Sequence, residues 1–240
     1  MKKVLLAAAL MFCCCQFVCA STLFYNGDVD TVGLGALNNT VTAGGGGQMV
    51  FDDFVVPEGG WDISAVFSNN QVPDIPLPYT ATGGTWEIWS DLDGAGQTLV
   101  ASGSTTTDFS WTPTGRSGFF PEYTLLISGL NVDLAPGTYW LAVSPFISDS
   151  GYAEISSTEG QNAIGTPLGS NGMAYVGTPQ GTDLVPSTDF IAGPVDDVSM
   201  GVDGTATPEP SPLLPLCAVA VAVCLIRRRL VLRQQRTQRG

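Results

Sequence analysis

The chain has 240 residues, with 29 glycines, 16 prolines and 13% charged residues. A hydrophobic content of 44% argues against disorder, and the many turn formers favour a β-rich extracellular domain. Arg116 is the only basic residue between residues 21 and 210, whereas all 22 acidic residues lie there, so this segment carries a net charge of −21. That charge opposes binding to nucleic acid and to anionic membrane surfaces.

Residue types needed for several chemistries are missing. The sequence contains no histidine, and all six cysteines lie in the two terminal segments. The segment between them therefore has no disulfide framework and no thiolate nucleophile or metal ligand. The lack of histidine also excludes a Ser-His-Asp triad and histidine-bound zinc. These features favour a protein that is not an enzyme.

The N-terminus has the pattern of a secretory signal. Two lysines precede an apolar run over residues 4–12, and a small residue precedes Ser21. The pattern predicts a helical signal peptide over residues 1–20, cut between Ala20 and Ser21. Lipidation at Cys19 is the alternative, but the valine before it is bulkier than a lipoprotein signal prefers.

Between the terminal segments, short alternating or β-branched runs are separated by Gly, Pro, Asn and Asp clusters. Residues 21–205 are therefore predicted to form an all-β extracellular domain, an antiparallel β-sandwich of jelly-roll type. The predicted strands are 23–25, 48–56, 62–68, 85–90, 98–102, 107–111, 122–129 and 138–144, with weaker signals at 152–156, 173–176 and 195–200.

A short acidic turn is the candidate metal site. Asp91 and Asp93 precede Gly94, and two carboxylates in a tight turn can share a Ca²⁺ ion with backbone carbonyls. The later ligands of an EF-hand loop are missing. Capping of the turn by the aspartate side chains explains the same residues without a metal. No other cofactor is predicted.

Two adjacent acidic pairs, Asp52–Asp53 and Asp196–Asp197, are candidates for carboxylate chemistry. Neighbours on a strand point to opposite faces, so neither pair can form a two-carboxylate acid–base site by itself. A glycoside hydrolase would need carboxylates brought together from different strands. Charges that protect sheet edges explain the pairs more simply.

Aromatic residues offer a possible sugar-binding surface. Trp86 and Trp89 are three residues apart, so on a regular strand they face opposite sides of the sheet. We expect one of them in the core and the other exposed or at a rim, where a tryptophan can stack on a sugar ring. The remaining tryptophans are expected mainly in the core.

The C-terminal segment, residues 206–240, has three consecutive parts: a motif at 207–211, an uncharged run at 211–226 and a basic tail at 227–240. The uncharged run is slightly shorter than the about 20 residues that span a bilayer as a helix. Snorkelling of Arg227 can make up the difference. Arg227, Arg228 and Arg229 form a stop-transfer cluster. This cluster favours a tail in the cytoplasm and a body on the outer side of the membrane.

The motif Pro208-Glu209-Pro210, the apolar run and the arginine cluster together resemble the PEP-CTERM sorting signal. The two prolines also hold Glu209 in an extended segment that is accessible for recognition. The resemblance implies processing by exosortase, a membrane-embedded cysteine transpeptidase, in a bacterium that makes exopolysaccharide. It further implies transient anchoring in the inner membrane before the protein reaches the cell surface or extracellular matrix.

The function predicted from the sequence is therefore that of an exported, non-enzymatic surface or matrix protein. A carbohydrate-binding module that holds exopolysaccharide through exposed aromatic side chains is the first alternative. A secreted glycoside hydrolase is the second.

Overall fold

The computed structural model describes residues 20–29, 37–42, 46–73, 79–92, 96–148, 151–169, 171–187 and 197–207. The predicted signal helix up to residue 19, Pro208–Pro210, the predicted span 211–226 and Arg227–Arg229 lie outside these residues. The chain divides into two compact units, Met1–Ala206 and Thr207–Gly240, and the described strands all belong to the first. Within the described ranges, no helix is long and apolar enough to cross a membrane.

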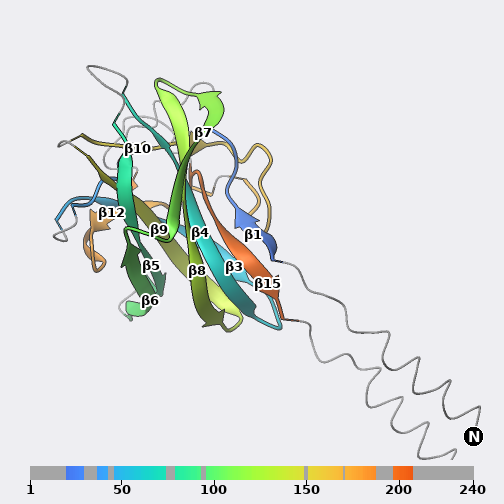
Figure 1. Ribbon diagram of the computed structural model, residues 1–240. Coiled ribbons are helices and arrows are strands. Elements are labelled where there is room, and N and C mark those ends of the chain that lie inside the picture. The colour runs from blue at the N-terminus through green and yellow to red at the C-terminus, as the bar shows by residue number, and fades with distance from the viewer. Residues whose placement is uncertain are drawn as a thin grey trace, which may run out of the picture. The chain divides into compact units, whose positions relative to one another are not determined.

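The described part of the first unit is made of strands that form two large antiparallel sheets and one small sheet (Figure 1). The strands are β1 (Ser21–Tyr25), β2 (Leu37–Asn38), β3 (Met49–Val56), β4 (Trp61–Gln71), β5 (Ala81–Ser90), β6 (Thr98–Thr105), β7 (Phe109–Ser117), β8 (Pro121–Leu134), β9 (Gly137–Ile147), β10 (Glu154–Ile155), β11 (Ser157–Thr158), β12 (Tyr175–Thr178), β13 (Thr182–Pro186), β14 (Asp197–Val198) and β15 (Met200–Ala206).

The first large sheet has seven strands and is built around β4. On one side of β4 lies β15, which pairs in turn with β1. On the other side lies β8, followed by β7. The end of β4 extends past the first residue of β15. There β4 pairs with β10, which pairs in turn with β2. The last of the described strands, β15, is therefore an interior strand of this sheet.

The second large sheet has six strands in the order β13-β12-β3-β9-β5-β6. Its central strands β3, β9 and β5 are joined by long antiparallel ladders. The small sheet consists of β11 and β14. Together these pairings confirm the predicted antiparallel β-sandwich.

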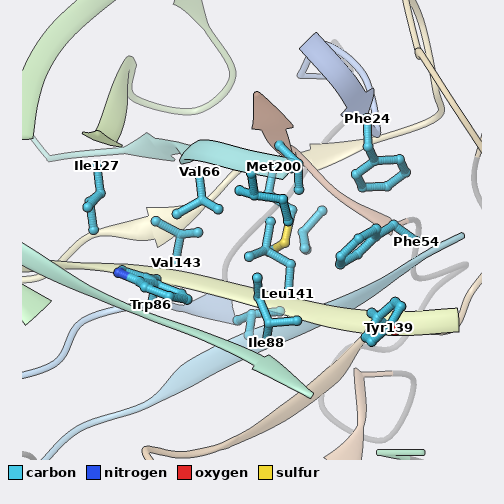
Figure 2. Packing of buried hydrophobic residues seen from close by; sticks show 14 of the residues in the cluster. Phe24, Phe54, Val66, Trp86, Ile88, Ile127, Tyr139, Leu141, Val143 and Met200 are labelled. Carbon is cyan, nitrogen blue, oxygen red and sulfur yellow. The ribbon is translucent and has the colours of Figure 1, made fainter. Parts of the chain in front are cut away.

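The main hydrophobic core lies between the two large sheets. Figure 2 shows Val66 and Met200, from the seven-stranded sheet, pointing toward Leu141 and Val143 of β9. Nearby, Phe54 packs its ring against neighbouring aromatic rings, at 5.5 Å from Phe24, 5.9 Å from Trp61 and 5.8 Å from Tyr139 between centroids. Burial of each large apolar side chain contributes about 1.5–3 kcal/mol, so this core is the main source of stability.

A second hydrophobic cluster covers the other face of the six-stranded sheet. Met49 and Phe51 of β3 belong to it, whereas Val50 and Phe54 of the same strand belong to the main core. Strand β3 is therefore buried on both faces. The other buried members are Val41, Trp89, Leu92, Trp140, Ala142 and Phe146.

Each of the eight main predicted strands is confirmed, with different limits at several ends. The weaker predicted strand 195–200 covers β14 and only the first residue of β15, which continues to Ala206. A Cβ atom on Gly201 would lie 2.5 Å from the carbonyl oxygen of Phe24, and one on Gly204 would lie 2.3 Å from that of Asp62. These glycines permit close approach of the neighbouring strands, although glycine usually weakens a strand.

Candidate functional site

The fold brings together carboxylates from two distant acidic pairs. Asp52 is on the interior strand β3, and Asp197 is in β14, beside it. Asp52 is 0% exposed, and its Oδ2 accepts hydrogen bonds from Nδ2 of Asn26 and from the backbone N–H of Val198, both at 2.7 Å. Its Oδ1 accepts the backbone N–H of Asp53 at 2.9 Å. Asp52 thus ties β3 to β14 and to the segment after β1.

Asp197 and Asp53 hold a nearby loop. The two carboxylate oxygens of Asp197 accept the backbone N–H groups of Asn171 at 2.8 Å and Gly172 at 2.9 Å. Nδ2 of Asn171 donates to Oδ1 of Asp53 at 2.9 Å. We call Asp52, Asp53 and Asp197 the buried carboxylate cluster, and it anchors residues 171–172 against the six-stranded sheet.

The three carboxyl groups of the cluster lie close together and are buried away from solvent. Burial, followed by the charges of Asp197 and Asp53, holds the pKa of the Asp52 carboxyl well above its ordinary value. Burial also raises the pKa of Asp197, and the charge of Asp53 adds to that shift. The hydrogen bonds from backbone N–H groups oppose both shifts because they favour the ionised carboxylate.

This geometry limits what the cluster can do chemically. Asp52 and Asp197 are both 0% exposed, so a substrate cannot reach them in this conformation. Across the described ranges, no three acidic or cysteine side chains are placed to hold a metal ion. The prediction that Asp52 and Asp53 protect a sheet edge is wrong, because both side chains are buried, at 0% and 7% exposed, on an interior strand of the six-stranded sheet. Asp196 lies outside the described residues.

Arg116, the one basic residue in the described ranges, is the centre of a second polar network. Its guanidinium forms ion pairs with Asp28 and with Glu122, the latter at 2.7 Å between Nε and Oε2. The hydroxyl of Tyr25 donates to Oδ1 of Asp28 at 2.7 Å, and Nδ2 of Asn162 donates to Oδ2 at 2.8 Å. Burial raises the pKa of the Tyr25 hydroxyl. The network links β7 and β8 to the residues that follow β1, a structural role that the sequence did not indicate.

The tryptophans are less exposed than predicted. Trp86 lies in the main core and Trp89 in the second cluster, so they do face opposite sides, but both are buried. Nε1 of Trp89 donates to Oε2 of Glu87 at 2.8 Å, and Oε1 of Glu87 accepts the backbone N–H of Gln180 at 2.7 Å. The prediction that one of the two tryptophans is exposed or at a rim is therefore wrong. The β12–β13 hairpin covers Trp89.

Trp111 of β7 is the described tryptophan that keeps a partly exposed side chain. Its ring is stacked on that of Tyr123, with centroids 5.3 Å apart and planes 2° apart. Trp111 also packs against the main core, so the pair offers only the partly exposed parts of its two rings. A flat aromatic surface of this kind can contact the apolar face of a sugar ring.

The candidate calcium turn is only partly described. Asp91 is exposed and adopts a left-handed backbone conformation with φ of 53°. Asp93 lies outside the described residues, so the calcium site stays a prediction. Nε2 of Gln97 donates to the carbonyl oxygen of Leu92 at 2.9 Å and helps to close this turn.

A shallow hollow of about 460 Å³ lies beside the predicted signal-cleavage point. Ala20, Ser21 and Thr22 line one part of it, and Ser64 and Asp203 another. Oγ1 of Thr22 donates to Oδ1 of Asp203 at 2.8 Å. The hollow is open and lined mainly by small side chains, and no motif in the sequence indicated it.

No protein-family model matches this sequence, and no curated protein matches it either.

Proposed function

We propose that this chain is an exported, non-enzymatic cell-surface or matrix protein that exosortase sorts through Pro208-Glu209-Pro210. The position of the strand ends supports the proposal. Strand β1 begins at Ser21, directly after the predicted signal peptide, and β15 ends at Ala206, two residues before Pro208. The sandwich therefore fills the chain between the two predicted targeting segments, and removal of both segments would leave every described strand intact.

The pairing of β1 with β15 adds further support. Ser21 is opposite Gly204, so the start of β1 and the end of β15 lie at the same end of the seven-stranded sheet. The C-terminal end of a signal peptide and the N-terminal end of a stop-transfer segment both lie at the outer face of the inner membrane. A domain whose chain enters and leaves at one end suits that arrangement without a long linker.

We also propose that the sandwich is a jelly roll. Its sheets contain the four-strand orders β1-β15-β4-β8 and β3-β9-β5-β6. Taken in sequence order, these eight strands alternate between the two sheets at every step except from β5 to β6, as two interleaved Greek keys require. In this interpretation β7, β10, β12 and β13 are additions at the sheet margins.

Substitution of the motif tests the sorting proposal. In a host that encodes exosortase, Glu209→Ala should leave a larger fraction of the chain at full length in the inner membrane, because the recognised carboxylate is lost. Intact-mass analysis of the membrane and extracellular fractions measures the effect. Glu159→Ala, which removes an exposed carboxylate from the sandwich, is the matched control and should be processed normally. Equal processing of both variants would contradict recognition through Glu209.

The second candidate is a carbohydrate-binding module, and the stacked Trp111–Tyr123 pair favours it. Trp111→Ala should lower the affinity for the host exopolysaccharide by about two- to tenfold, since an aromatic stacking contact is worth about 0.5–1.5 kcal/mol. Pull-down with the purified polysaccharide measures the change, and circular dichroism checks the fold. Leu168→Ala, at an exposed apolar side chain elsewhere, should bind like the wild type. Equal binding by both variants would exclude this surface.

A glycoside hydrolase is the third candidate, and the described geometry does not favour it. Asp52 and Asp197 come from different strands, as a hydrolase would require, but both are buried beneath the surface. We therefore retain the non-enzymatic function as the proposal.

A further inference from the structure

Strand β6 forms one edge of the six-stranded sheet, beside β5 (Figure 1). It has eight residues, Thr98–Thr105, with no charged residue and no proline. Its exposed side chains include Leu99 and Val100, which are 40% and 41% exposed. An edge strand has unpaired backbone N–H and C=O groups along its outer side, and these groups are a template for another strand.

The other longer edge strands that the structure describes carry features that discourage such pairing. Strand β7 contains Pro113 and Arg116, and β13 contains Asp183 and Pro186. The outer side of β1 is partly occupied, because Tyr25 exchanges two backbone hydrogen bonds with Ile164, at 2.9 and 2.8 Å. Within the described residues, β6 is thus the long edge that lacks charge, proline and cover.

We propose that β6 pairs antiparallel with β6 of a second copy of this chain. A strand that pairs with itself about a two-fold axis needs no second complementary sequence. A β-bulge interrupts the ladder with β5 between Leu99 and Ala101, whereas residues 101–105 are regularly paired. Centred on Gly103, this segment places Ala101 opposite Thr105 and Ser102 opposite Ser104 of the partner. All of these side chains are small, so the two edges can approach without a clash.

The strength of this association should depend on the salt concentration, because both copies are strongly acidic. The edge itself is uncharged, so no like charges lie directly opposite one another. Two bodies of net charge −21 nevertheless repel each other at longer range. Because salt screens that repulsion, the affinity of the pair should rise as NaCl is increased from about 0.05 M to about 0.5 M. An association held by ion pairs would weaken over the same range.

The pairing concerns the sandwich alone and does not depend on the sorting proposal. Where copies are attached to the same surface or matrix, it would join one six-stranded sheet to the next. The proposed partner is therefore β6 of a second copy of this chain.

Analytical ultracentrifugation of the purified full chain in a mild detergent, over a range of protein and salt concentrations, tests the proposal. Ser102→Lys/Ser104→Lys places two charges at exposed positions of β6 and should weaken self-association by about tenfold or more. Thr112→Lys/Ser117→Lys adds the same charge at exposed positions of β7 and is the matched control. It should associate at least as strongly as the wild type, since it lowers the repulsion equally.

Hydrogen–deuterium exchange gives a second measurement that does not depend on any variant. Among residues 101–105, the backbone amides that point away from β5 should become protected as the wild-type protein associates. A wild type that stays monomeric at high protein and salt concentration would overturn the proposal, as would equal association of the two double variants. Protection of β6 without self-association would also overturn it, because the added strand would then come from another partner.

Discussion

A sandwich that starts at Ser21 and stops after Ser199 should fail to fold, whereas one that stops after Ala206 should keep its structure. The shorter chain lacks β15, whose side chains Met200 and Val202 are 0% exposed in the main core. It also loses the ladders that β15 forms with β1 and β4. Burial of the two side chains alone contributes about 3–6 kcal/mol, against a total stability of about 5–15 kcal/mol for a typical domain.

Far-UV circular dichroism and urea unfolding of the two truncated chains measure this difference. The longer chain should show β-sheet signal and one cooperative transition, and the shorter chain should show neither. If the shorter chain unfolds cooperatively with similar stability, β15 is not the interior strand that the register indicates. The result bears directly on processing, because a cut near Pro208–Pro210 leaves β15 intact.

The free energy of unfolding should fall as pH rises above about 4, because of the buried carboxylate cluster. The pKa of Asp52 is raised in the folded state, so the folded protein binds more protons than the unfolded chain between the ordinary aspartate pKa of about 3.9 and the raised value. This stabilisation is fully present below the ordinary pKa and is lost as pH rises through the raised one. Asp197 acts in the same direction.

Asp52→Asn should flatten this pH dependence, because the amide carries no charge for burial and the neighbouring Asp197 and Asp53 to oppose. Asp52→Ala should cost about 3 kcal/mol or more, since it leaves three hydrogen-bond donors without their acceptor and opens a cavity. Urea unfolding between about pH 4 and about pH 8 measures both effects. Asp62→Asn, at an exposed position of β4, is the control for loss of one carboxylate. An unchanged pH slope in Asp52→Asn would contradict the raised pKa assigned to Asp52.

The strands of this fold were largely predictable because each is a local pattern. Alternation and β-branching located β3, β5, β8 and β9, and turn residues separated them. The predicted strand 195–200 reaches only the first residue of β15, and Gly201 and Gly204 weaken the local strand pattern beyond it. Only the contact partners, Phe24 and Phe67 beside Gly201, explain why glycine is needed within that strand.

The candidate site was much less predictable because it depends on strand order. The sequence favours an edge position for Asp52 and Asp53 because charges at an edge discourage pairing between sheets. The interior position of β3 follows from its pairing with both β12 and β9, and that pairing is not visible in a local pattern. Burial of Trp89 likewise depends on the β12–β13 hairpin, which lies about 90 residues later in the chain.

The mass of the wild-type protein recovered from a host that encodes exosortase tests the central claim most directly. A mature chain that begins at Ser21 and ends near Pro208–Pro210 is the expected result, with the whole sandwich retained and the span 211–226 removed. A chain recovered from the cell surface that still ends at Gly240, or one that keeps residues 1–20 and stays in the cytosol, would contradict it.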